Sequence, residues 1–144
     1  MIEVRHAGIV VSNPVKSLEF YRGLLGLKVT KDAEESGEYI DCVLRMKRVK
    51  VRTIKLTGDN AAGMIELLYF KSPKSPKKKR EFADVGCSHV AFTVSDVEAK
   101  YKKLVKKGVV FNSPPKISPD KYAKVAFCKD PDGESVELVE VLQK

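Results

Sequence analysis

Two stretches of the chain, HAGIVVSNPVKSLEFYRGLLGL at residues 6–27 and HVAFTVSDVEAKYKKLVKKGV at residues 89–109, share one pattern. Each begins with a histidine and continues through a run of β-branched and aromatic residues, which favour strands. Each then reaches Ser followed by Asn or Asp, the residue types that cap helices, and ends in a helical pattern closed by glycine. The repetition indicates an internal duplication of one strand–helix unit.

After each of these helices the sequence shows strand signals only. In the first half they lie at residues 27–30, 39–45, 51–57 and 64–70; in the second half they lie at 109 and its neighbours, 122–128 and 135–142. The turn sequence DPDG at residues 130–133 predicts that the last two strands form a hairpin. We interpret each half as βαβββ and predict an α+β fold, in which paired βαβββ modules form a concave mixed sheet.

Length and composition are those of one folded domain. The 144 residues are 43% hydrophobic and 32% charged, which is enough apolar surface for one core. We expect a single domain over residues 1–144, with module one at 1–70, a basic linker at 71–85 and module two at 86–144. No apolar run is long enough to span a bilayer and the N-terminus lacks a secretory pattern, so we expect no membrane partner and a cytoplasmic protein.

The net charge of +8 raises the question of a nucleic-acid partner. Most of this excess lies in one segment, KSPKSPKKKR at residues 71–80, which has six basic residues and no acidic one. A segment with two prolines and two serines cannot bury apolar surface, so we interpret it as a solvated linker. Nucleic acid is therefore not expected as a partner.

A second match between the halves places two carboxylates inside apolar strands. MIELL at 64–68 parallels SVELV at 135–139, and the shared acidic residues are Glu66 and Glu137. A carboxylate in such a strand is costly to bury unless it is paired or bound to a cation. The only two histidines of the chain, His6 and His89, open the two duplicated units. Taken singly, each of these residues is more often structural, but their matching placement favours a shared role.

Strand alternation sharpens this hypothesis. Residues two apart share a face, so small side chains such as Gly8 and Ala91 lie beside the histidines and leave space for a ligand. Two imidazoles and two carboxylates form a donor set suited to one divalent ion: Ni, Zn, Co, Fe or Mn. We predict a metal site with open positions, and hence a catalytic one, formed by His6, Glu66, His89 and Glu137.

Five segments resemble the vicinal oxygen chelate superfamily, the glyoxalase/bleomycin resistance/dioxygenase group. They are His6 with the following strand and Ser12-Asn13, LEFYRGLLGLKV at 18–29, MIELLYF at 64–70, CSHVAFTVSD at 87–96 and KDPDGESVELVEV at 129–141. The resemblance covers nearly the whole chain and is greatest to the glyoxalase I (lactoylglutathione lyase) branch. It implies paired βαβββ modules around a metal, with the family's ligands carried over to His6, Glu66, His89 and Glu137.

The resemblance also implies an activity. A lactoylglutathione lyase-like enzyme catalyses proton transfer on a small carbonyl–thiol adduct through a metal-stabilised enediolate. Glu137 is the expected base and Glu66 its partner. Two alternatives remain open: a methylmalonyl-CoA epimerase-like enzyme and a resistance protein that sequesters a small molecule. One departure from the glyoxalase I pattern is Val10, where that branch commonly has an arginine for the glutathione carboxylate.

The duplication also predicts an assembly. Each module contributes one His and one Glu, so a complete site requires two modules, supplied either by one chain or by two. Exposed sheet edges favour closure by a second copy. We therefore expect a homodimer that acts on a small-molecule substrate.

Overall fold

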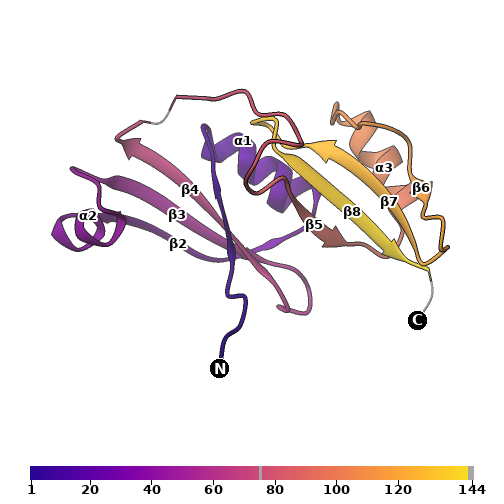
Figure 1. The fold of residues 1–144 in the computed structure, drawn as a ribbon, viewed down its shortest axis with the longest axis horizontal. Coiled ribbons are helices and arrows are strands. Elements are labelled where there is room, and N and C mark those ends of the chain that lie inside the picture. Colours follow the sequence, from indigo (N-terminus) through magenta and orange to yellow (C-terminus); the bar gives the residue numbers. More distant parts are fainter. Residues whose placement is uncertain (75, 143–144) are drawn as a thin grey trace. The chain divides into compact units, whose positions relative to one another are not determined.

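The computed structural model describes residues 1–74 and 76–142. The chain divides into two compact units, Met1–Lys79 and Arg80–Lys144, and the division falls within the predicted basic linker. Each unit has a four-stranded mixed sheet in which the first strand lies beside the last (Figure 1). The predicted α+β fold is thereby confirmed, while its organisation as a single domain stays a prediction.

The first unit has the strand order β1-β4-β3-β2, with β1 parallel to β4 and the other neighbours antiparallel. A short helix that continues as a π-helical turn follows β1, and a second helix joins β2 to β3. The elements are β1 (Ala7–Val10), α1 (Pro14–Leu18), η1 (Glu19–Leu24), β2 (Lys28–Ser36), α2 (Glu38–Leu44), β3 (Lys50–Thr57) and β4 (Met64–Ser72).

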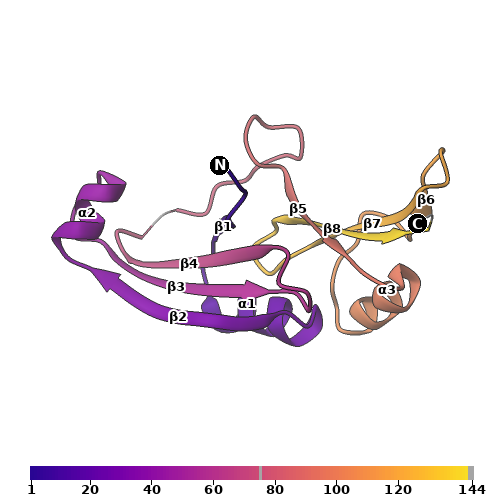
Figure 2. The ribbon, with the colours of Figure 1, turned by 90° about the horizontal axis from the view of Figure 1, so that it is seen from below.

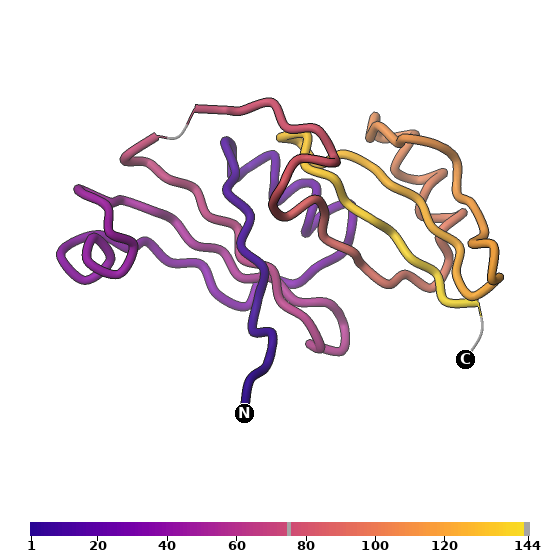
Figure 3. The backbone as a smooth tube through the Cα atoms, in the orientation of Figure 1, coloured from indigo at the N-terminus to yellow at the C-terminus, as the bar shows by residue number. Residues whose placement is uncertain are grey.

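The second unit repeats this arrangement with the order β5-β8-β7-β6, and the backbone course can be followed in Figure 3. Again the first strand is parallel to the last. The elements are β5 (His89–Thr93), α3 (Val97–Lys106), β6 (Lys116–Ile117), β7 (Ala123–Lys129) and β8 (Ser135–Val141). The predicted hairpin is confirmed, because the Asp130 carboxylate accepts the backbone N–H groups of Asp132 and Glu134 at 2.8 and 2.9 Å.

The predicted helix caps are present in both units. The Asn13 side chain accepts the backbone N–H groups of Val15 and Lys16, both at 3.1 Å, and Pro14 occupies the first helical turn. In the second unit Asp96 accepts the N–H of Ala99 at 2.9 Å. These contacts satisfy backbone donors that a helix leaves unpaired at its start.

The buried side chains of the first helix do not follow one regular helical stripe. Val15 is 63% exposed, whereas Phe20 and Tyr21 are buried. The cause is the π-helical turn, seen in the hydrogen bond from Leu25 N to Phe20 O at 2.9 Å. Five residues per hydrogen-bonded turn shift the side chains away from the 3.6-residue period.

Each sheet has one face that packs against the helix following its first strand, α1 in the first unit and α3 in the second (Figure 2). In β4, Ile65 and Leu67 are buried on that face, and in β8 the equivalent residues are Val136 and Leu138. The alternation of a strand places the intervening glutamates on the opposite face. This face, which carries the predicted site residues, is called the ligand face below.

One predicted strand is a helix. Residues 39–45 were expected to form a strand, but Glu38–Leu44 is α2. Its residue Ile40 is buried together with Val49 and Val51, and the Asp41 carboxylate accepts the backbone N–H of Val49 at 2.7 Å. Local β propensity in this segment is therefore outweighed by tertiary packing and by a side-chain hydrogen bond to the following loop.

Two further boundaries differ from expectation. Strand β2 extends to Ser36, well beyond the predicted end at residue 30, because it pairs along the whole of β3. In the second unit the strand expected near Val109 is β6, at Lys116–Ile117, and Phe111 forms only an isolated bridge with Cys128. Across residues 1–74 and 76–142, helices are too short to traverse a bilayer.

Candidate functional site

The strand register brings each glutamate beside the start of its unit. Parallel pairing places Gly8 opposite Glu66 in the first unit and Ala91 opposite Glu137 in the second. Each histidine lies two residues before that small residue and so belongs to the same row of the ligand face. The two units thus present their histidine and glutamate from equivalent positions.

The side chains of each pair are in contact. His6 Nε2 lies 3.1 Å from Glu66 Oε2, and His89 Nε2 lies 3.1 Å from Glu137 Oε2. The glutamates are 13% and 19% exposed, so each carboxylate is largely withdrawn from water but still reachable from the ligand face. Within each unit, the structure therefore brings together the two residues that the sequence had singled out.

The donor chemistry of each pair fits a divalent metal. Two donors bound about 2.1 Å from one ion at right angles lie roughly 3 Å apart, which matches the 3.1 Å between nitrogen and oxygen in both pairs. Within residues 1–74 and 76–142, no group of three or more His, Cys, Asp and Glu side chains is close enough to hold an ion. Each unit by itself offers two donors, and the four-ligand site stays a prediction.

The two histidines differ in their second ring nitrogen. His89 Nδ1 lies 2.7 Å from Ser88 Oγ, whereas His6 Nδ1 is buried without a hydrogen-bond partner among the described residues. The tautomer of a histidine is set by the hydrogen bonds of its two nitrogens. For His6, the contact that can select the tautomer is the one between Nε2 and the Glu66 carboxylate.

Lys55 is a residue of this face that the sequence prediction missed. It lies directly opposite Glu66 in the β3–β4 register, and its Nζ is 3.7 Å from Glu66 Oε1. The position opposite Glu137 in the β7–β8 register is occupied by Phe127. No signal in the sequence set Lys55 apart, because the same strand also carries Lys50 and Arg52.

In the second unit aromatic side chains surround the histidine, and Phe127 rather than a lysine lies opposite the glutamate. Phe82 stacks on the His89 ring with centroids 5.6 Å apart, and Phe127 meets the same ring edge-on at 5.3 Å. Phe82 and Phe127 also contact each other at 5.5 Å. Sequence reasoning missed Phe82, because it had assigned residues 71–85 as a solvated linker and a lone aromatic there carried little weight.

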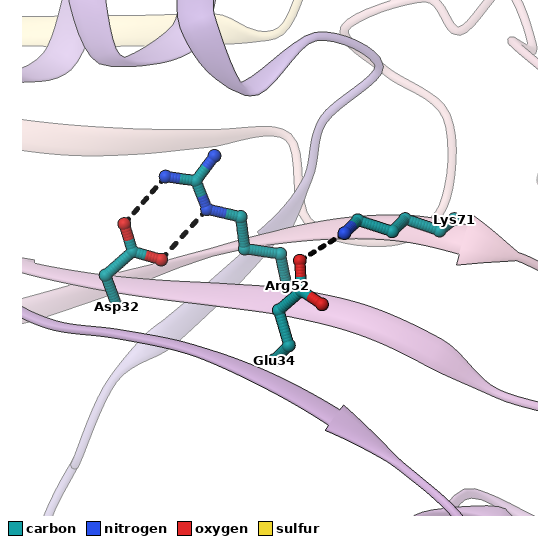
Figure 4. Close-up of polar contacts among 4 residues, drawn as sticks. All are labelled: Asp32, Glu34, Arg52 and Lys71. Atoms are coloured by element: carbon teal, nitrogen blue, oxygen red, sulfur yellow. Dashed lines mark hydrogen bonds and ion pairs between the residues drawn. The ribbon is translucent and has the colours of Figure 1, made fainter.

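A separate charged cluster lies on the other face of the first sheet (Figure 4). Arg52 donates two hydrogen bonds to Asp32, at 2.9 and 2.7 Å, and Lys71 pairs with Glu34. The Arg52 guanidinium holds the pKa of Asp32 below its ordinary value. Because Lys71 belongs to β4, the predicted linker begins after this strand, and the cluster has no part in the ligand face.

Comparison with known proteins adds three findings. The sequence profile of the Glyoxalase/Bleomycin resistance protein/Dioxygenase superfamily matches residues 3–138. Glyoxalase I of Saccharomyces cerevisiae is 29% identical over 140 residues, and the match spans 93% of this chain but only 42% of the yeast protein. The uncharacterised protein YwkD of Bacillus subtilis is 30% identical over 140 residues, 95% of both chains.

Solved structures give the same picture for the fold. A glyoxalase family protein of Bacillus cereus has a TM-score of 0.88 and 20% identity, and the match covers 99% of this chain and 96% of that one. At this identity the likeness concerns the fold alone. The strands and helices that carry each His–Glu pair thus have the arrangement found in solved proteins of this fold.

Proposed function

The chain belongs to the glyoxalase/bleomycin resistance protein/dioxygenase superfamily, and on that premise we propose that it is a metal-dependent lyase or isomerase of the glyoxalase I type. Its substrate would be a small adduct of a carbonyl compound and a thiol. The observation that carries the proposal is the repeated His–Glu contact at 3.1 Å, one in each unit, on equivalent strands. A duplicated pair of this kind is difficult to explain by packing alone, because neither carboxylate needs to be there for the core to form.

In this proposal, His6, Glu66, His89 and Glu137 bind one divalent ion, with Ni, Zn, Co, Fe and Mn as the candidates. When bound by these residues, the ion would supply Lewis acidity that stabilises negative charge developing on the substrate. The equal spacing of nitrogen and oxygen in both units supports these residues as ligands. The complete site requires two modules, from one chain or from two.

Glu137 is the proposed base, and the contacts of the two glutamates support this choice. Glu66 has two basic neighbours, His6 and Lys55, one near each carboxylate oxygen. Among the described residues, the one ion pair of Glu137 is with His89. A carboxylate with fewer partners moves more easily to take a proton from the carbon beside a carbonyl and return it to the next carbon.

The aromatic residues around His89 would assist this proton transfer. Phe82 and Phe127 cover the ring that contacts Glu137, and an apolar surround excludes water that would otherwise exchange with the transferred proton. The similarity to yeast glyoxalase I gives the reaction class further support. Because the chain spans less than half of that relative, its substrate and whole-protein activity belong to the proposal.

The test is turnover of the methylglyoxal–glutathione adduct by protein supplied in turn with Ni, Co and Zn. We expect formation of the thioester with at least one ion and its loss in His89→Ala. A matched control is Ser118→Ala, which lies outside the ligand residues and should leave turnover intact. Absence of turnover with every ion would eliminate the glyoxalase assignment and leave the fold unaffected.

A second candidate function is sequestration of a planar small molecule. It is favoured by one observation, the stack of Phe82 on His89, in which Phe82 remains 49% exposed and offers a second aromatic face. Binding of this kind requires no metal. Retention of affinity for a planar ligand after complete removal of metal would favour it over the enzyme.

We also propose a homodimer, because the edge strands are β1 and β2 in the first sheet and β5 and β6 in the second, and edge strands offer backbone groups to a partner. Among the described residues, exposed apolar side chains such as Val10 on β1 support a partner at that edge. Light scattering of the purified chain measures the mass directly, and a monomer at micromolar concentration would contradict this.

A further inference from the structure

The two units share their backbone register and their His–Glu contact but differ in the residue that lies opposite the glutamate on the neighbouring antiparallel strand. In the first unit Lys55 lies opposite the glutamate, and in the second unit Phe127 does. The two halves keep the same histidine and glutamate donors. They differ chemically, because the neighbour of the glutamate is an ammonium group in the first unit and a phenyl ring in the second. The difference therefore bears on what each half binds.

The Lys55 ammonium has one acidic neighbour among the described residues. Its side chain is only 22% exposed, and its one ion-pair partner there is Glu66. The distance of 3.7 Å between Lys55 Nζ and Glu66 Oε1 is too long for a hydrogen bond. An ammonium has three N–H donors, so Lys55 can bind a further anion.

The position of Lys55 also matters once Glu66 acts as a ligand. A carboxylate that shares its charge with a divalent ion neutralises a neighbouring lysine less well, so the ammonium then attracts another anion more strongly. Gly8 lies on the far side of Glu66 and has no side chain to supply one. A ligand bound on this face can supply it.

We propose that Lys55 binds a carboxylate of the substrate, attached directly beside the oxygens that the His6–Glu66 half of the site receives. The inference rests on the proposed function and deepens it, since it makes the first module the half that recognises the substrate's charge. Phe127 gives the second module no such capacity. Among carbonyl–thiol adducts, the preferred substrate is accordingly one that carries an ionised carboxylate next to its reacting oxygens.

The experiment uses two acids that differ by one carboxylate. Glycolate offers a hydroxyl and a carboxylate to a metal, and hydroxymalonate offers the same pair plus one free carboxylate. Affinities of both for the full chain, supplied with Ni, are measured by calorimetry in wild type, Lys55→Met and Lys55→Arg. Lys31→Met is the matched control, because Lys31 is the cross-strand neighbour of Lys55 on the same face and its side chain is exposed.

The quantity of interest is the ratio of the two affinities, which cancels any change in metal binding or in folded fraction. We expect Lys55→Met to lower the preference for hydroxymalonate about 10-fold, as for loss of one charge-assisted contact. Lys55→Arg and Lys31→Met should keep it within about 3-fold. An unchanged ratio in Lys55→Met, an equal loss in Lys31→Met, or no binding of either acid by wild type would overturn the inference.

Metal content is measured on the same samples, so that the inference and the proposed function fail separately. Protein that takes up none of the candidate ions yet prefers hydroxymalonate through Lys55 supports the carboxylate site and refutes the metalloenzyme. Protein that binds Ni with a ratio independent of Lys55 does the opposite. Loss of Ni from Lys55→Met would assign the lysine to positioning Glu66 and would likewise overturn the inference.

Discussion

Replacing Asp41 by alanine tests why residues 38–44 form a helix. The Asp41 carboxylate accepts the backbone N–H groups of Arg48 and Val49, at 2.9 and 2.7 Å, and so fastens the loop that follows α2. Val49 is 1% exposed, so water cannot replace the hydrogen bond of its N–H, whereas the N–H of the exposed Arg48 can be solvated. At roughly 1.5–3 kcal/mol for a hydrogen bond to a charged group, we expect a loss of about 2 kcal/mol in the free energy of unfolding.

Urea unfolding followed by circular dichroism measures this loss, with an unchanged slope as the sign that only stability has altered. Asp41→Asn is the matched control, since it keeps one oxygen acceptor and should lose about half as much. Amide hydrogen exchange locates the effect, because Val49 should lose protection in the alanine variant. A change below about 0.5 kcal/mol, or full protection of the Val49 amide, would refute this account of α2.

Three other predictions concern the site, its assembly and the charged cluster. Glu137→Gln should lower turnover about 10²- to 10⁴-fold, as for loss of a general base, while His89 still binds metal; turnover near the wild-type rate would exclude Glu137 as the base. Mixing His6→Ala with Glu137→Ala chains should restore activity if sites form across two chains, and no recovery after verified exchange would rule that arrangement out. Because Arg52 lowers the pKa of Asp32, their pairing stabilises the fold above the ordinary pKa and is lost as pH falls through the lowered one. The acid sensitivity of unfolding between about pH 5 and 2 should therefore decrease in Asp32→Asn, by about 0.5 kcal/mol for so exposed a pair; an unchanged profile would contradict this.

The sequence was sufficient for the features that repeat. The caps at Asn13 and Asp96, the last hairpin and the presence of one histidine and one glutamate in each unit follow from residue type, period and duplication. These signals are local, or they become visible when one half of the chain is compared with the other. For that reason the candidate pairs could be predicted without coordinates.

The features that were missed depend on contacts between residues distant in sequence. Helix α2 has strand-like residues, and its conformation is decided by the Asp41 carboxylate and by packing of Ile40 against Val51. The importance of Lys55 arises from the cross-strand register, which places it opposite Glu66. Phe82 acquires a role only by folding back onto His89. None of these contacts has a spacing that a sequence pattern could reveal.

In the proposed function the two His–Glu pairs are halves of one metal site. The measurement that tests this is elemental analysis of protein purified without chelators and without a histidine tag. We predict about one divalent ion per chain in the wild type and its loss in both His6→Ala and His89→Ala. Protein that folds normally but retains no ion, or that retains the ion in both variants, would contradict the claim.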